Sequence, residues 1–494
     1  MIIKKPLLFV FIALSFSAWN QNDVGYLNGA FVTASTLTNE GPADSTLSNN
    51  KGHTDQRIGL RLKNTSFGFS LFKASPKNIN LIPLIDLGAQ YNDGVQHRNG
   101  IGFLIEARPI KKSYMRIGGL VDVSNSTLLN PGNINVSDLG KSQELWFLPM
   151  TRLAYTPNEV FSFQVGYDKN FIGDGRRSLF LSDYGKPMPF GQIRAQFWNM
   201  EYSVNYQFLS ENFNGQRQSK YVTSHYLSWD ILPWLNLGVF EAVVFQPKDT
   251  LLNRGYDVEY LNPFVFYRPQ EYSMGSSDNV VIGAALKATL KKTTLYSQIV
   301  LDEFLLSEIR ARSGWWANKF GLQVGISGSL DLGLSFLTYR IEGNMVRPYT
   351  FSHLTPLQVY GHLGAPLAHP YGSNFSELLT EINWKKRVDG KLKLKLIASF
   401  GFQGLDLNDL NYGSDIYQSY INRPNDFGNF IGQGLKQTFF RTNTRASYHL
   451  SNKGNIHAFA ELQTQYIEMG GFKNLSFLPM IGIRSYLWND YRNY

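Results

Sequence analysis

The stretch KLKLKLIA, residues 391–398, alternates lysine with leucine. A period of two is the spacing of a β-strand, whose neighbouring side chains point to opposite faces. A helix would spread the same lysines around its whole circumference. The sequence therefore predicts a strand with one cationic face and one aliphatic face, and the fold depends on what lies against each.

The same alternation recurs along the chain. Near the C-terminal end, His457, Glu461 and Gln463 share one face of a segment whose other face carries Ala458 and Leu462. Charges on one side only indicate one wet face and one apolar face. We predict about 18 antiparallel strands, within roughly 16 to 20. The segments are 57–63, 66–73, 80–91, 101–108, 114–123, 145–155, 161–167, 191–208 (split at 199–200), 222–229, 235–245, 279–290, 293–301, 318–326, 331–340, 376–385, 391–402, 437–449, 455–467 and 475–488.

The first twenty residues have the pattern of a secretory signal peptide. Lys4 and Lys5 precede an apolar run, and small residues follow it. The run is shorter than the roughly 18 residues a spanning helix needs. We expect cleavage between Ser17 and Gln21, which leaves residues 21–494 as a single domain. The two lysines account for the difference between a net charge of +9 and +7 for the exported chain.

Composition favours a membrane β-barrel. Aromatic residues make up 14% of the chain and charged residues only 17%, as an apolar outer band with aromatic girdles requires. The final strand, which ends near Trp488, is rich in Gly and aromatic residues. There is no cysteine for a disulfide, a lipid anchor or a thiolate metal site. A large secreted β-sandwich or propeller is the alternative, but the sequence has no fixed-period repeat.

Three long stretches interrupt the strands, at 246–278, 341–375 and 403–436. Loops of this length are uncommon unless functional, and in such barrels long loops belong to the outer end. We expect them to face outward or to fold into the lumen. A helix is predicted at 302–312, because Asp302 and Glu303 lead it, arginines follow and Gly314 ends it.

No motif points to catalysis, a cofactor or nucleic acid. The chain lacks a nucleophile elbow, a zinc-protease motif and phosphate-binding loops. Basic runs interleaved with aromatics along one helix are also missing. His353, His362 and His369 lie close in sequence, but no carboxylate or thiolate alternates with them, so hydrogen-bonded loop histidines are favoured over a metal site. We therefore expect a non-enzymatic protein without a metal or cofactor.

Arg176 and Arg177 follow a Gly-Asp-Gly turn and precede Asp183. One interpretation is a structural loop with an internal Arg–Asp ion pair. The other is a site that grips carboxylate or phosphate groups of a glycan, since guanidinium binds both bidentately.

Two further stretches carry candidate binding residues. Tyr267, Arg268 and Glu271 mix an aromatic ring with charges that suit sugar hydroxyls, or they pack as a plug. Trp315 and Trp316 follow the predicted helix directly, which favours a plug over an interfacial belt.

The motifs at 168–183, 262–279, 301–304 and 343–353 resemble the capsule-assembly Wzi family. The continuation through 360–362, 366–370 and 372–375 is most similar to the gliding-motility RemB-like branch of Bacteroidetes-type bacteria. The resemblance spans roughly residues 80–488. It implies an outer-membrane barrel of about 18 strands closed by helices and loops. It also implies a lectin-like, non-catalytic role in holding surface polysaccharide, or, for the RemB-like branch, a role in motility.

The resemblance adds the remaining candidates to the list of glycan-binding or plug residues: Arg347, Tyr349, His353 and His369, with Asp302 and Glu303 as plug acids. The expected partners are outer-membrane lipid and lipopolysaccharide, acidic surface polysaccharide and other envelope proteins. A structural part of a motility or export complex and a diffusion porin remain open alternatives. In a barrel, Leu392, Leu394 and Leu396 face lipid, and Lys391, Lys393 and Lys395 face the lumen, or the periplasmic rim if the strand end lies there. Plug acids or an anionic polymer would offset their charge.

Overall fold

The computed structural model describes residues 27–29, 79–91, 94–125, 134–140, 143–247, 255–263, 278–387, 390–407, 410–452 and 455–485. The predicted signal peptide, the predicted strands at 57–63 and 66–73, and the candidates Tyr267, Arg268 and Glu271 lie outside these ranges. No helix in the described ranges is long and apolar enough to cross a membrane.

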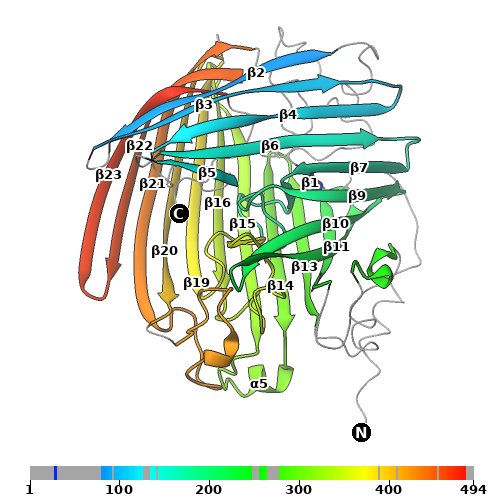
Figure 1. Ribbon diagram of the computed structural model, residues 1–494, viewed down its shortest axis with the longest axis vertical. Helices are drawn as coiled ribbons and strands as arrows, with labels where there is room; N and C mark the ends of the chain where they lie inside the picture. The colour runs from blue at the N-terminus through cyan, green and yellow to red at the C-terminus, as the bar shows by residue number, and fades with distance from the viewer. Residues whose placement is uncertain are drawn as a thin grey trace.

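Within the described ranges, 18 antiparallel strands close into one barrel, which confirms the predicted fold (Figure 1). The predicted split at residues 199–200 is also confirmed, because β9 ends at Phe197 and β10 begins at Met200, after a turn at 198–199. The wall strands are β2 (Asn80–Tyr91), β3 (Val95–Ala107), β4 (Ser113–Ser124), β6 (Gln143–Tyr155), β7 (Phe161–Asp168), β9 (Met188–Phe197), β10 (Met200–Phe213), β11 (Gln216–Leu232), β12 (Leu235–Phe245), β13 (Asn279–Leu290), β14 (Thr293–Glu303), β15 (Lys319–Asp331), β16 (Ser335–Val346), β19 (Phe375–Lys386), β20 (Leu392–Leu405), β21 (Leu435–Ser451), β22 (Ile456–Met469) and β23 (Phe472–Ser485).

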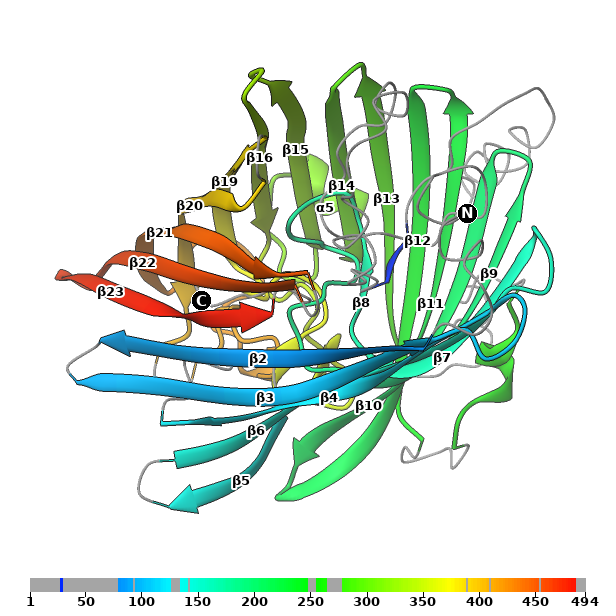
Figure 2. The same cartoon turned by 90° about the horizontal axis from the view of Figure 1, so that it is seen from above.

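The smaller elements lie beside or between the wall strands. Strand β5 pairs with the start of β6, and β7 pairs with its end. Two short pairs, β1 with β8 and β17 with β18, stand apart from the wall, and Figure 2 shows β1 and β8 inside the ring. These elements are β1 (Leu27–Gly29), β5 (Ile134–Gly140), β8 (Asn170–Ile172), β17 (Gly361–His362), β18 (Ala365–Pro366), α5 (Leu306–Arg310) and the 3-10 turns η2 (Val258–Leu261) and η3 (Tyr420–Asn422).

The barrel closes where β23 pairs with β2. Asp86 faces Arg484 in that register, and Arg484 Nε donates to Asp86 Oδ1 at 2.8 Å. Arg98 also pairs with Asp86, and it lies 3.5 Å from Asp122. All four side chains are buried, so the seam joins three neighbouring strands to β23 through compensated charges.

The connections differ sharply between the two ends of the barrel. At one end, the turns that join consecutive wall strands are short, as at 198–199, 233–234 and 291–292. At the other end lie the long connections, including 169–187, 347–374 and 406–434. Short periplasmic turns and long outer loops are the rule for bacterial barrels, so the long-loop end is the expected outer end.

The two faces of the wall differ as the alternation predicted. Exposed large apolar side chains cover the outward face, whereas charged residues are buried on the inward face. In β20, Leu394 and Phe400 are exposed on the outward face, and Lys395 points inward. Lys395 Nζ lies 2.7 Å from Glu381 Oε1 on the neighbouring strand β19. The lumen-facing orientation is therefore confirmed for Lys395, and the acid beside it is a wall glutamate.

The predicted helix at 302–312 is too long at its start. Asp302 and Glu303 are the last residues of β14, and α5 spans only Leu306–Arg310. Two contacts explain the difference. Glu303 is the register partner of Lys319 and pairs with its ammonium at 2.9 Å. The carboxylate of Asp302 accepts the backbone N–H of Phe351 at 2.8 Å, which ties the strand end to the loop after β16.

Two loops from the long-loop end fold into the lumen and form an apolar core there, together with wall residues and Ile416 of the connection 406–434. The first is 169–187, and the second is 347–374, shorter at both ends than the predicted 341–375 because β16 continues to Val346. The ring of Phe180 stacks on that of Phe240 in β12, with centroids 4.7 Å apart. Ser182 binds the second loop, its N–H donating to Leu367 O at 2.7 Å. We call these two loops the plug.

The described part of the predicted loop 246–278, residues 255–263, takes another course. Tyr260 packs with Val243, Phe245 and Val280. The residues directly before and after these three in β12 and β13 that are buried in the apolar core face the plug instead. These three residues therefore lie on the outward face of β12 and β13. Tyr202 reaches the same stretch, since its hydroxyl donates to Pro263 O. This stretch lies neither in the lumen nor at the loop end, but against the outer wall.

A plug network and an aromatic cluster at the long-loop end

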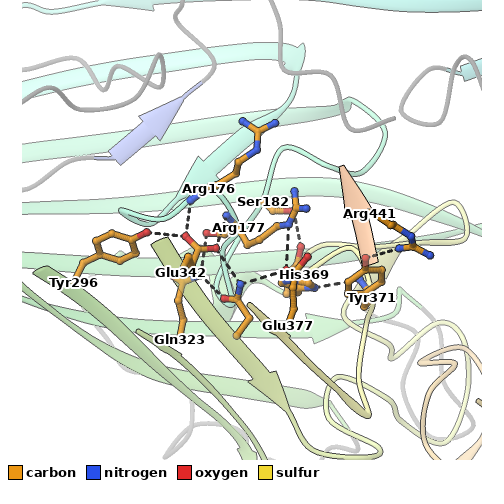
Figure 3. A network of polar contacts seen from close by, with 12 residues as sticks. Arg176, Arg177, Ser182, Tyr296, Gln323, Glu342, His369, Tyr371, Glu377 and Arg441 are labelled. Atoms are coloured by element: carbon orange, nitrogen blue, oxygen red, sulfur yellow. Dashed lines mark hydrogen bonds and ion pairs between the residues drawn. The ribbon is translucent and has the colours of Figure 1, made fainter. Parts of the chain in front are cut away.

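The sequence-predicted Gly-Asp-Gly turn places two arginines at the inner wall of the barrel (Figure 3). Gly173 has φ +151°, and a Cβ on Gly175 would lie 2.4 Å from Glu342 Oε2. Only glycine allows this approach. The backbone N–H groups of Arg176 and Arg177 then donate to the two oxygens of Glu342, at 2.7 and 3.1 Å.

The arginine side chains contact carboxylates on β19. Arg176 Nη1 lies 3.5 Å from Glu381 Oε1, and Arg177 Nε lies 3.6 Å from Glu377 Oε2. All four side chains are at least nine-tenths buried. Asp183, predicted as the acid of an internal pair, is also buried, and the ion pairs seen for the two arginines run to wall glutamates. These arginines anchor the plug to the wall, which is the structural interpretation of the motif.

The network continues through His369 and Tyr371. His369 Nε2 lies 3.0 Å from Glu377 Oε2, and the imidazole stacks on Phe375 with centroids 4.3 Å apart. Tyr371 contacts the guanidinium of Arg441 on β21 through its hydroxyl (Figure 3). Burial lowers the pKa of His369, and the hydrogen bond to Glu377 opposes that shift.

The three loop histidines have separate partners. His353 Nδ1 lies 2.9 Å from Gln358 Oε1, and His362 Nδ1 accepts the N–H of Ser210 at 3.1 Å. Burial lowers the pKa of both, that of His362 to about 3. Groups of three or more His, Asp or Glu side chains able to hold a metal ion are absent from the described ranges.

Other candidates meet where the connections after β14, β16 and β20 come together at the long-loop end. Trp315 and Trp316 lie edge to face, with centroids 6.3 Å apart. Trp316 contacts Tyr349 at 6.1 Å and Tyr420 of η3 at 4.7 Å. His353 lies 5.8 Å from Tyr420. The sequence thus predicted four of these five aromatic side chains, and it missed Tyr420.

Cations surround these rings. The guanidinium of Arg423 lies 4.1 Å from the centre of the Trp316 ring. Lys319 Nζ lies 4.7 Å from that of Tyr420 and, as noted, pairs with Glu303. Arg347 Nη2 donates to Asn429 O at 3.2 Å, which holds the loop after β20 against the others. We call Trp315, Trp316, Tyr349, His353 and Tyr420, with Lys319, Arg347 and Arg423, the mouth cluster.

The mouth cluster is partly open to solvent. Its two tryptophans, Tyr420 and Arg423 are half-buried, whereas Tyr349 is fully buried. Burial raises the pKa of Tyr349 well above its usual range, so its hydroxyl stays protonated and donates to Asn411 O at 2.8 Å. Half-exposed rings beside cations can stack on sugar faces and pair with carboxylates.

Sequence reasoning missed several residues that the geometry makes central. Glu377 and Glu381 anchor the plug, and their spacing on an alternating strand was a usable signal for inward-facing acids. Tyr420 and Arg423 lie in an irregular loop, 406–434 in the structure against the predicted 403–436. No periodicity there could indicate that they would meet Trp316.

No protein-family model and no curated protein matches the chain. Among solved structures, it is similar to Wzi of Escherichia coli, described as an outer-membrane protein involved in group 1 capsule assembly and a carbohydrate-binding β-barrel. The identity is 13% and the TM-score 0.56, over 85% of this chain and 86% of that one. The OprD structure of Pseudomonas aeruginosa matches at 10% identity and a TM-score of 0.43, over 83% and 96%. The similarity to Wzi shows a shared barrel fold.

Proposed function

We propose that this protein is a non-enzymatic outer-membrane β-barrel that binds or organises surface polysaccharide. The observation that carries the proposal is the mouth cluster, in which three loops bring half-exposed tryptophan and tyrosine rings together with cations. The plug beneath it supports a binding role, because its apolar core fills lumen volume that a channel would need. The carbohydrate-binding description of Wzi supports the same ligand class.

The rings and the cations suggest complementary parts in binding. Stacking on a sugar face needs an aromatic platform, which Trp315 and Trp316 offer. A carboxylate or phosphate on the glycan would bind Arg423 or Arg347, which favours acidic surface polysaccharide. Lipid and lipopolysaccharide would surround the apolar outward face of the wall.

Binding of purified protein to an array of bacterial surface polysaccharides tests the proposal. We expect wild type to bind at least one acidic glycan and Trp316→Ala/Arg423→Ala to lose most of that binding. Phe472→Ala is a matched control, because Phe472 is 82% exposed at the same end of the barrel and belongs to β23, which contributes no residue to the mouth cluster. Absence of binding to any glycan, or equal binding by the double variant, would contradict the proposal.

A second candidate, a structural part of a motility or export complex, has one observation in its favour. The stretch 255–263 lies irregularly folded against the outward wall. Irregular backbone at membrane depth is normally covered by protein rather than lipid. Co-purification of stoichiometric envelope proteins, without glycan binding, would support this candidate over the first.

A further inference from the structure

A place where the plug reaches the wall lies at the long-loop end, between β9 and β10. The pairing of β9 with β10 extends only to Phe190 and Gln207, whereas β10 continues to Phe213. Beyond that pairing the second plug loop lies against β10, because Leu363 N donates to Ser210 O at 3.0 Å. Groups from the plug and groups from the wall therefore meet at this edge.

Arg217 of β11 is exposed on the outward face beside this edge. Lys220 and Val222 of the same strand contact the plug, and Arg217 is an odd number of residues away from both, so it points outward. Its Nε and Nη2 both donate to Ser210 Oγ at 3.1 Å, and Tyr167 on the outward face of β7 also contacts it. Within the described ranges, the guanidinium is thus held by hydroxyl groups and not by a carboxylate. It keeps its charge and further N–H donors for another anion.

Lys186 brings a second positive charge from the first plug loop. It is half-buried, and its Nζ donates to Leu363 O at 3.2 Å. Burial lowers the pKa of Lys186, the carboxylate of Glu211 opposes that shift, and the charge of Arg217 adds to it. The two cations therefore lie within electrostatic reach of each other. Glu211 itself is on the lumen side of β10, 3.8 Å from Lys220.

The position of these cations along the strands is that of lipid headgroups. Phe208, Tyr221 and Phe245 are successive register partners on the outward faces of β10, β11 and β12, and Phe208 is 44% exposed. Aromatic rows of this kind lie at the boundary between hydrocarbon and headgroups. Ser210 is two residues, and Arg217 four residues, further towards the loops. At about 3.3 Å per residue, the guanidinium lies beyond the aromatic row, at the level of lipid phosphates.

We propose that Arg217 and Lys186 form a binding site for the phosphate group of an outer-leaflet lipid such as lipopolysaccharide. A guanidinium binds two oxygens of a phosphate, and an ammonium adds a point charge. The outward face and the aromatic row below favour a lipid over a soluble phosphate. Because Lys186 belongs to the plug and Arg217 to the wall, the bound phosphate would join the two from outside the barrel. The proposal goes beyond the glycan-binding function and does not depend on the mouth cluster.

Native mass spectrometry of the purified full-length protein, released from detergent, tests this site with diphosphoryl lipid A as the probe. Dephosphorylated lipid A is the neutral control, and inorganic phosphate is the soluble competitor. We expect wild type to retain diphosphoryl lipid A in preference to the dephosphorylated form. Arg217→Gln should bind it about tenfold more weakly, and Arg217→Gln/Lys186→Gln more weakly still. Arg217→Lys should lie between Arg217→Gln and wild type, because it keeps the charge but loses the two-oxygen contact.

Lys473→Gln is the matched control, because Lys473 is an exposed cation at the same end of the outward face, on β23, and pairs with Glu468 at 3.6 Å. It should bind lipid A like wild type, and retained heat-modifiable mobility would show that each variant is folded. Equal binding by wild type and Arg217→Gln, or binding that ignores the phosphates of lipid A, would overturn the inference. Displacement of lipid A by inorganic phosphate at equal concentration would also overturn it, since the site would then take a free anion.

Discussion

At the scale of the residue, the close approach of Gly175 to Glu342 determines how the plug meets the wall. The carboxylate of Glu342 accepts two plug N–H groups and the hydroxyl of Tyr296, the last at 2.8 Å. Several hydrogen-bond donors offset the free-energy cost of burying a carboxylate, and loss of these donors would leave that cost without compensation. The sequence predicted the tight turn and the two arginines, but not the acid they meet, because Glu342 is 166 residues away.

Gly175→Ala should therefore loosen the plug. The added methyl group would lie 2.4 Å from Glu342 Oε2 and 2.7 Å from Arg177 O, so the turn must move. We expect a loss of about 1–3 kcal/mol in local stability, measured as faster hydrogen exchange at Arg176 and Arg177. Gly185→Ala is the control, since its Cβ would meet only Pro366 O at 3.5 Å and Ala365 at 3.9 Å. Similar exchange in both variants would contradict this account of the turn.

Phe400→Arg tests which face of the wall meets lipid. Phe400 is 55% exposed on the outward face of β20, near the middle of the strand. An arginine there should lower the free energy of unfolding in lipid by about 2–4 kcal/mol. Phe400→Leu should lower this free energy far less. Equal stability of the two variants in denaturant titrations would place this face in water.

At the scale of the element, alternation was a sufficient signal for the wall. The bounds predicted for 80–91, 235–245 and 279–290 are those of β2, β12 and β13. The helix was predicted too long, because the acids Asp302 and Glu303 serve contacts with the plug and with β15 instead of a helix start. Loop paths were beyond sequence reasoning, since they depend on contacts between segments far apart in the chain.

The plug should weaken as pH falls. His362 Nδ1 lies 3.1 Å from Ser210 N and 3.2 Å from Ser210 O, and burial holds the pKa of the imidazole at about 3, so the folded plug keeps this ring neutral. The unfolded loop binds a proton near pH 6.5. The stabilisation is thus complete above that pH and is lost as pH falls from 6.5 towards 3, by about 2 kcal/mol at pH 5. His369 shifts in the same direction.

Hydrogen exchange of residues 347–374, corrected for the intrinsic pH dependence, measures this effect. Protection should decrease between pH 7 and pH 5 in wild type and change less in His362→Gln. Constant protection across that range would show that these histidines do not hold the plug.

At the scale of the whole molecule, a barrel whose lumen holds its own loops differs from an open channel. The apolar core joins plug residues such as Phe180 and Tyr360 to wall residues such as Phe240 and Val281. Composition, the predicted signal peptide and alternation indicated the barrel, and the motif resemblance indicated a plug. The sequence left open which loops fill the lumen, and the structure assigns 169–187 and 347–374.

The central claim, that the protein binds a ligand at its mouth and does not conduct through its lumen, is tested most directly by conductance in planar bilayers. Wild type should show no steady ion conductance. A variant in which residues 352–370 are replaced by a short Gly/Ser linker should conduct, since it removes most of one plug loop. Stable wild-type channels of the same conductance as that variant would contradict the account and favour a porin.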